Sequence, residues 1–258
     1  MATLYYNAAV DTDWATLGNW WTSDAFTTPA SALPTSSDSV VLSATCDANS
    51  GSEPTVVNMT MTGNDGFRIT ITVTGQASFE GYTFTDGTIT GDCTFADNSS
   101  SDAGTINGNC TFNDSSYTLG STITGDCTFN DYSLHNSTIT GDCTFNNSST
   151  NPYGGITGDC TFNNSSINGD PDGISTSFIL GNATFNDSSV NAGEIIGDAT
   201  FSDNSIMVGD SSVSVSGSIT IGGNPIRMTL SALFTASPGF LFTRAQLGIN
   251  GSSILGVV

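Results

Sequence analysis

The chain has 258 residues, of which 24 are acidic, three are Arg, one is His and none is Lys, so its formal net charge is −21. Three scattered arginines (Arg68, Arg227 and Arg244) cannot form a basic patch, which excludes binding to nucleic acid or to anionic membrane surfaces. The sequence has no apolar run long enough to span a membrane, and Met1–Val10 does not resemble a signal peptide. We therefore expect synthesis in a cytoplasm and, if the protein acts outside the cell, release by a route other than secretion, of which lysis with virus release is one.

Residues 1–65 do not follow the repeat that fills the middle of the chain. They contain all three tryptophans, Trp14, Trp20 and Trp21, and several prolines. A stack of strands needs its open end covered, because an exposed edge recruits other chains. The segment is therefore predicted to be an N-terminal cap with a Trp-containing core, an attachment segment for a larger particle, or both.

A seven-residue motif, Ile-Thr-Gly-Asp-Cys-Thr-Phe, organises residues 66–222. The Cys position of this motif recurs every 16 or 17 residues over most of the repeat, with longer steps of 23 and 20 residues near its end. A short motif at a nearly fixed step is typical of a repeat architecture. The full copies are Ile89–Phe95, Ile123–Phe129, Ile139–Phe145 and Ile156–Phe162, and the looser copies are Val73–Phe79, Ile106–Phe112, Ile179–Phe185, Ile195–Phe201 and Val215–Ile221.

Within the motif, Ile, Gly, Cys and Phe alternate with polar residues, and this period of two predicts a strand with these four residues inward. Asn, Asp, Ser and Gly between the motifs favour turns. A second column, seven residues after each Cys position, is expected to form another inward segment. It contains Phe84, Ser100, Tyr117, Leu134, Thr150, Ile167, Val190 and Ile206.

One repeat cannot bury its own apolar face, but stacked copies can, with Ile on Ile and Phe on Phe. The predicted fold is therefore all-β: a single-chain parallel β-solenoid with about nine coils of ~16–17 residues, between non-repeat caps. The general preference of parallel β connections favours a right-handed β-helix.

An outward column of acidic and amide residues precedes the Cys position. Stacked carboxylates at ~5 Å match the spacing of a retaining glycosidase pair, but catalysis needs two carboxylates in different environments, and this stripe is uniform. Polysaccharide lyases share the fold class, yet the repeats lack the basic residues of that chemistry, and His135 is expected to be exposed. We therefore predict no catalytic residue and no enzyme activity. The column contains Asp92, Asn109, Asp126, Asp142, Asp159, Asn182 and Asp198.

The cysteines of the repeats form one inward column, with Ala at the same position in two later copies. Neighbours in this column can tolerate a disulfide, but the exchange with Ala favours buried, reduced Cys acting as a small apolar residue. One straight column cannot place four sulfurs around zinc, and 170–173 (Asp-Pro-Asp-Gly) lacks the spacing of a calcium loop. No metal or cofactor is predicted. The column contains Cys93, Cys110, Cys127, Cys143 and Cys160.

Threonine and asparagine form further columns. Thr-Ile-Thr triplets, as at 88–90, 122–124 and 138–140, resemble the arrays of ice-binding solenoids, although Thr also stacks well simply as a β-former. The asparagines after Phe are expected to form an internal amide ladder that stabilises a turn. They are Asn113, Asn130, Asn146, Asn163 and Asn186.

Residues 223–258 contain two apolar stretches, Leu230–Phe234 and Phe240–Phe242, and an uncharged end. Such a segment is expected to cap the solenoid or to pack against another subunit of the same chain. Closed symmetry then predicts a cyclic homo-oligomer, and a trimer is favoured.

The repeats resemble the shafts of phage tail fibres, tailspikes and capsid appendages in their Asn-, Asp-, Ser- and Gly-rich turns. The opening, with Trp20-Trp21, Pro34 and Asp38–Val41, resembles the entry segment of bacterial β-helix adhesins. The resemblance implies a non-enzymatic structural protein of a phage-like virion, with virion proteins and a host surface glycan as partners. The alternatives are an extracellular adhesin or carbohydrate-binding rod, an ice-binding protein, and a glycan-degrading spike.

Overall fold

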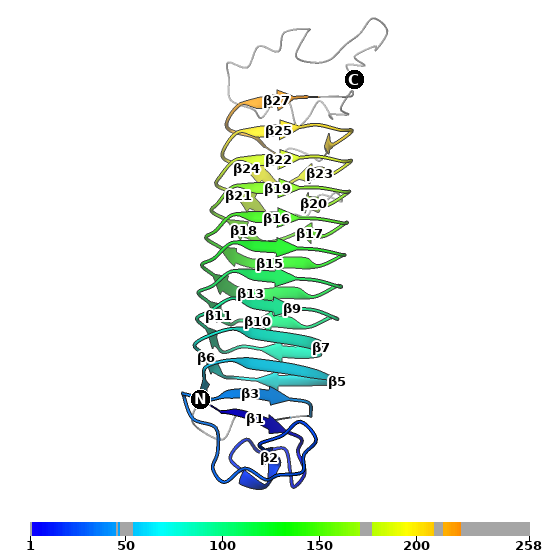
Figure 1. Ribbon diagram of the computed structural model, residues 1–258. Coiled ribbons are helices and arrows are strands. Elements are labelled where there is room, and N and C mark those ends of the chain that lie inside the picture. Colours follow the sequence, from blue (N-terminus) through cyan, green and yellow to red (C-terminus); the bar gives the residue numbers. More distant parts are fainter. Residues whose placement is uncertain (1, 45, 47–53, 171–176, 209–213, 223–258) are drawn as a thin grey trace, which may run out of the picture. The chain divides into compact units, whose positions relative to one another are not determined.

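The computed structural model describes residues 2–44, 46, 54–170, 177–208 and 214–222. These residues form an all-β fold, a parallel β-solenoid with about nine turns, as the sequence predicts. The chain divides into two compact units, residues 1–127 and 128–258. Figure 1 shows the strands of each unit in successive layers along the chain.

In the first unit, parallel pairing starts at β1 and passes through β3 and β5 to β7, so it begins inside the segment 1–65. The elements of this unit are β1 (Thr3–Tyr6), η1 (Leu17–Asn19), β2 (Trp20–Trp21), β3 (Ser39–Leu42), β4 (Thr55–Val56), β5 (Met59–Ile69), β6 (Thr72–Val73), β7 (Ala77–Thr85), β8 (Thr88–Ile89), β9 (Cys93–Phe95), β10 (Ser100–Asp102), β11 (Thr105–Ile106), β12 (Cys110–Phe112) and β13 (Tyr117–Ile123).

The second unit repeats the same arrangement, and β14 (Cys127–Phe129) contains the division between the units. Its other strands are β15 (Leu134–Ile139), β16 (Cys143–Phe145), β17 (Thr150–Asn151), β18 (Gly155–Ile156), β19 (Cys160–Phe162), β20 (Ile167–Gly169), β21 (Phe178–Ile179), β22 (Ala183–Phe185), β23 (Val190–Ala192), β24 (Glu194–Ile195), β25 (Ala199–Phe201), β26 (Ile206–Met207) and β27 (Ile219–Ile221).

The core of each unit is built from identical side chains stacked on one another. In the first unit Phe79, Phe95 and Phe112 stack with ring centroids 4.7 and 4.9 Å apart. In the second unit the stack runs from Phe129 to Phe201 at spacings of 4.7–4.9 Å. Because the strands pair in register, each ring lies directly over its equivalent. The predicted Ile, Cys and Phe core is therefore confirmed.

The motif is not one continuous strand, however, and the prediction that Gly points inward is wrong. Ile89 ends β8, Thr90 and Asp92 are exposed, and β9 starts at Cys93. Gly91 lies at the bend between them, where a Cβ would come within 2.3 Å of the Gly75 carbonyl oxygen. Glycine is thus required because the bends of successive coils lie in direct backbone contact.

A tight turn follows the motif Phe in each coil from Phe95 to Phe201 and shifts the inward positions by one residue. In residues 146–149, both central residues have positive φ, and the Ser149 amide donates to the Asn146 carbonyl at 3.1 Å, as in a type I′ turn. Ser149 is fully buried, so the next residue, Thr150, turns outward and Asn151 is buried. The prediction of a second inward column at these positions is therefore wrong for Tyr117, Leu134, Thr150, Ile167, Val190 and Ile206, although Ser100 is fully buried; the side chain of Phe84 lies outside the described residues. The inward neighbours of this predicted column are mainly polar: Ser101, Thr118, His135, Asn151, Asn168, Asn191 and Met207.

The free edge of β1 is covered by the antiparallel strand β2. Trp20 is fully buried, its ring contacts Tyr6 and Trp14 edge-on at 5.1 and 4.6 Å, and its indole N–H donates to the Trp14 carbonyl at 2.9 Å. The short partner strand and this aromatic cluster therefore shield an edge that could otherwise pair with another chain.

Candidate functional site

The outward Asp and Asn column forms a ladder of hydrogen bonds between coils. Oδ1 of Asp92 accepts the amide N–H of Asn109 at 2.9 Å, and Oδ1 of Asn109 accepts that of Asp126 at 2.9 Å. The second unit repeats the pattern from Asp142 to Ser218, at 2.6–2.9 Å. Only an acceptor oxygen is needed, which explains why Asp and Asn alternate freely. The column is exposed, as predicted, but its role is to tie one bend to the next.

Asp159→Asn is expected to leave the free energy of unfolding nearly unchanged, whereas Asp159→Ala should lower it by about 1 kcal/mol. The reason is that Asp159 Oδ1 accepts the Asn182 amide at 2.7 Å, and only Asn keeps this acceptor. Urea unfolding of both variants followed by circular dichroism measures the difference. Equal loss in both variants would show that the charge, and not the acceptor oxygen, matters.

Two amide ladders stabilise the turns and the core of the second unit. The predicted ladder is confirmed: the Asn146 side chain donates to Asn130 at 2.9 Å, Asn163 to Asn146 at 3.0 Å, and Asn186 to Asn163 at 3.0 Å. A second, fully buried ladder was not predicted from the sequence. There Asn151 donates to Asn168 at 2.9 Å and Asn168 to Asn191 at 2.8 Å. Its signal was Asn one residue beyond the column that was taken as inward.

His135 lies in the core of the second unit and not on the surface, so the expectation of an exposed side chain is wrong. Its ring packs 5.4 Å from Phe129 and 6.4 Å from Phe145, and it is completely buried. It occupies the position that Asn151 takes in the next coil. Burial lowers the pKa of His135 to about 3, against a smaller opposing effect of a hydrogen bond with the Gly155 backbone. The histidine is therefore neutral at pH 7 and fills the polar inner column.

This burial predicts a loss of stability in acid. The folded pKa of His135, about 3, lies below the ordinary value of 6.5, so on acidification the unfolded chain binds a proton that the folded chain does not. The contribution of neutral His135 to the free energy of unfolding is complete above pH 6.5. It is lost as the pH falls towards 3, at about 1.4 kcal/mol per pH unit. Unfolding free energies measured from pH 7 to pH 4 test this.

The control is His135→Asn, which places at this position the residue found in the next coil and removes the titrating group. The carboxylates are the same in both proteins, so the difference between their pH profiles isolates the histidine. Parallel profiles of the two proteins between pH 6.5 and pH 4 would contradict the assignment.

The threonine columns lie on the outside, as predicted. Thr105 pairs with Thr88 and Thr122 in register, and Thr122 and Thr124 are exposed. In the second unit the same face changes character: Gly155 pairs with Phe178, and Phe178 pairs with Glu194. The column of the Thr-Ile-Thr triplets is therefore interrupted in this unit. The other threonine column, one residue before the motif Phe, stays in register from Thr144 to Thr220.

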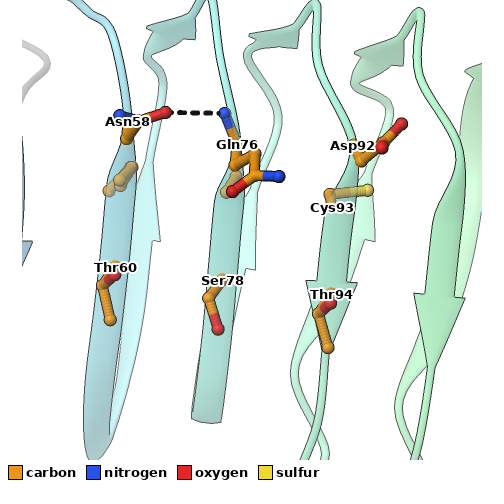
Figure 2. A pocket seen from close by; sticks show the side chains of 9 residues that line it. Asn58, Thr60, Gln76, Ser78, Asp92, Cys93 and Thr94 are labelled. Carbon is orange, nitrogen blue, oxygen red and sulfur yellow. Dashed lines mark hydrogen bonds between the residues drawn. The ribbon is translucent and has the colours of Figure 1, made fainter.

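A polar hollow of about 400 Å³ lies on the outer face of β5, β7 and β9 in the first unit. Figure 2 shows two rows of side chains across these strands, one of Asn58, Gln76 and Asp92, the other of Thr60, Ser78 and Thr94. The buried Met59, Ala77 and Cys93 lie between the rows.

Asn58 is held in place, because its Oδ1 accepts the Gln76 amide at 2.9 Å and its Nδ2 donates to Ser39 Oγ at 3.1 Å. Two rows of amide, carboxylate and hydroxyl groups on a firm sheet can hydrogen-bond a polar ligand. This hollow was not predicted from the sequence because it lies where the repeat is loosest, with Gln76 in place of Asp or Asn.

Some predicted features fall outside the described residues. These are most of the loop 170–173, Arg227, Arg244 and the whole segment 223–258, with its predicted capping and trimer contacts. Among the described residues, no three His, Cys, Asp or Glu side chains are arranged to hold a metal ion. That same part of the chain contains no helix of the length and apolar character needed to cross a membrane.

Comparisons of the chain with protein families, with curated proteins and with solved structures find no match.

Proposed function

We propose that this chain is a non-enzymatic structural protein of a phage-like virion, a fibre, spike or capsid-decoration subunit. The observation that carries the proposal is the use of the repeated polar side chains. The Asp and Asn of each bend bond the next coil, the asparagines bond one another, and the turn serines bond carbonyls of neighbouring coils. These polar side chains hydrogen-bond neighbouring coils, and such a use is typical of a structural scaffold.

Two further features support a structural role in a larger particle, because both limit non-specific association of the chain. The net charge of −21 opposes non-specific association with nucleic acid and favours solubility. The Trp-containing layer at β1 and β2 closes one edge of the stack, so assembly through that edge is suppressed. We propose that contacts between subunits involve the C-terminal part of the chain, in a homotrimer.

The test is purification of virus-like particles from lysates of the cells that produce this chain. The chain should band with particles in a density gradient, appear in their peptide spectra, and be labelled on the fibre, spike or capsid surface by gold-conjugated antibodies. The purified chain should have about three times the monomer mass of 26.5 kDa by light scattering. Recovery of the chain only in the particle-free fraction would overturn the virion role, and a monomer mass would overturn the trimer.

The polar hollow favours a second candidate, a carbohydrate-binding rod. Amide and hydroxyl groups in two rows match the donors and acceptors of a neutral glycan, and about 400 Å³ accommodates one or two sugar rings. A fluorescent glycan panel should then show binding that falls at least tenfold in Gln76→Ala and Ser78→Val. The matched control is Thr111→Val, which lies on β12 outside the hollow. Equal binding by all three variants would rule out this site.

A further inference from the structure

In the first unit, three cysteines form a continuous buried column, and two of them are almost in bonding contact. Cys110 pairs in register with Cys93 across β12 and β9, and their Sγ atoms are 2.6 Å apart. A disulfide bond has an S–S length of ~2.05 Å, so the sulfurs need to approach by only about half an ångström. Strand neighbours in register, ~4.8 Å apart, lie within the range of Cα separations that disulfides tolerate.

Cys110 lies between two cysteines of the column, Cys93 and Cys127, and contacts both of them. Its sulfur lies 2.6 Å from that of Cys93, and the Cys127 thiol also donates towards its own Gly125 carbonyl at 3.9 Å. Burial raises the pKa of the Cys110 thiol, and contacts with Cys127 and then Cys93 raise it further. The thiolate needed for exchange is therefore scarce in the folded coil.

We propose that Cys93 and Cys110 are a modification site, at which a small disulfide oxidant such as oxidised glutathione closes an inter-coil disulfide. One cysteine thiolate attacks a sulfur of the oxidant and releases one glutathione thiolate, which leaves a mixed disulfide on the protein. The second cysteine attacks the protein sulfur of that mixed disulfide and releases the second glutathione. Two protein thiols are oxidised, one disulfide is reduced to two thiols, and the thiol protons go to the released thiolates.

The consequence is a covalent link between adjacent coils. The bond closes a loop of 17 residues, and it leaves the repeat unchanged because both sulfurs already lie inside the core. Both thiols are buried, so the oxidant reaches them while the coils form or open and not in the closed fold. The cysteines are thus free in a reducing compartment and become linked when the coils form or open in an oxidising one.

The experiment refolds the full chain from denaturant with a mixture of oxidised and reduced glutathione. Free thiols are then alkylated in denaturant, and the chain is cut before each Asp without reduction. This places Cys93, Cys110 and Cys127 on separate peptides, 92–96, 102–113 and 126–130. Mass spectrometry should find 92–96 linked to 102–113. Full alkylation of all six cysteines, or 102–113 linked mainly to 126–130, would overturn the proposal.

Two alanine variants form a matched pair, because Ala already occupies this position at Ala77, Ala183 and Ala199. Cys127→Ala should retain the link. Cys110→Ala should leave peptide 92–96 without a link to 126–130, since Cys93 and Cys127 are two coils apart. In the wild-type protein and in Cys127→Ala, the oxidised form should unfold at higher denaturant concentration than the reduced form, and in Cys110→Ala the difference between the two midpoints should be smaller than in Cys127→Ala. If the disulfide formed but left the denaturant midpoint of the wild-type protein unchanged, its proposed role in stabilising adjacent coils would be overturned.

Discussion

Phe145→Ala is expected to lower the free energy of unfolding by about 3–5 kcal/mol. Phe145 is fully buried, and its ring stacks between Phe129 and Phe162 with both centroid distances at 4.7 Å. Removing it opens a cavity and breaks two ring contacts together. The hydrogen-bonded coils above and below cannot collapse into the space, because their register fixes the spacing. Chemical unfolding followed by circular dichroism gives the value.

The control for this change is Thr144→Ala, one residue earlier on the same strand. Thr144 is only half-buried and points outward, so its loss should cost about 1 kcal/mol or less. If the threonine variant were the less stable of the two, the inside and outside of β16 would have been exchanged, and the assigned core would be wrong.

Gly158→Ala is expected to destabilise the protein by about 2–3 kcal/mol, although it adds one methyl group. A Cβ at Gly158 would lie 2.3 Å from the carbonyl oxygen of Gly141 and 2.5 Å from its carbonyl carbon. Both atoms belong to backbone that is fixed by the ladder between coils, so no side-chain rotation relieves the contact. The coils must separate at the bend, which weakens the neighbouring hydrogen bonds.

Gly222→Ala is the matched control, because among the described residues the atom nearest to its Cβ would be Ser202 Cβ, at 4.0 Å. This variant should lie within about 0.5 kcal/mol of the wild-type protein. The two midpoints of chemical unfolding measure the difference. Equal effects would mean that glycine in the bend serves only chain flexibility and not the approach of two backbones.

The repeat predicted most of the fold from physical pattern alone. Equivalent residues at a nearly constant step imply stacked coils. The core of these coils is implied by the even spacing of the motif, with Ile four residues before Cys and Phe two residues after it. The amide ladder of Asn146 and Asn163 followed from the same reasoning, because identical side chains in register can bond one another. These features depend on composition and spacing, which a sequence contains in full.

The errors have a common physical cause. Counting by two assumes an unbroken strand, but the bend at Gly91 interrupts the strand, and the turns after Phe95 and its later equivalents shift the alternation by one residue. The second inner column was therefore placed one residue early, and the burial of His135 and Asn151 was missed. The ladder through Asp92 was read as a solvated stripe, because nothing in the sequence shows that the next bend brings an amide N–H to its carboxylate.

The polar hollow could not be predicted for another reason. It depends on the shape of three neighbouring strands, and its members Asn58 and Gln76 belong to coils in which the motif has diverged. A repeat search gives such positions the least weight. The same divergence is what distinguishes this face from the uniform columns around it, so looser copies of a repeat are good places to look for a ligand surface.

Equivalent residues of successive coils pair in register, and this has a consequence for how the chain can change its length. Excision of residues 147–163 would join Asn146 to Asn164, which stands where Asn147 does, 17 residues earlier in the chain. Each remaining aromatic ring, amide and bend would find an equivalent partner at the new junction. Gene duplication or deletion of whole coils can therefore lengthen or shorten the protein in discrete steps, without any need to redesign what lies on either side.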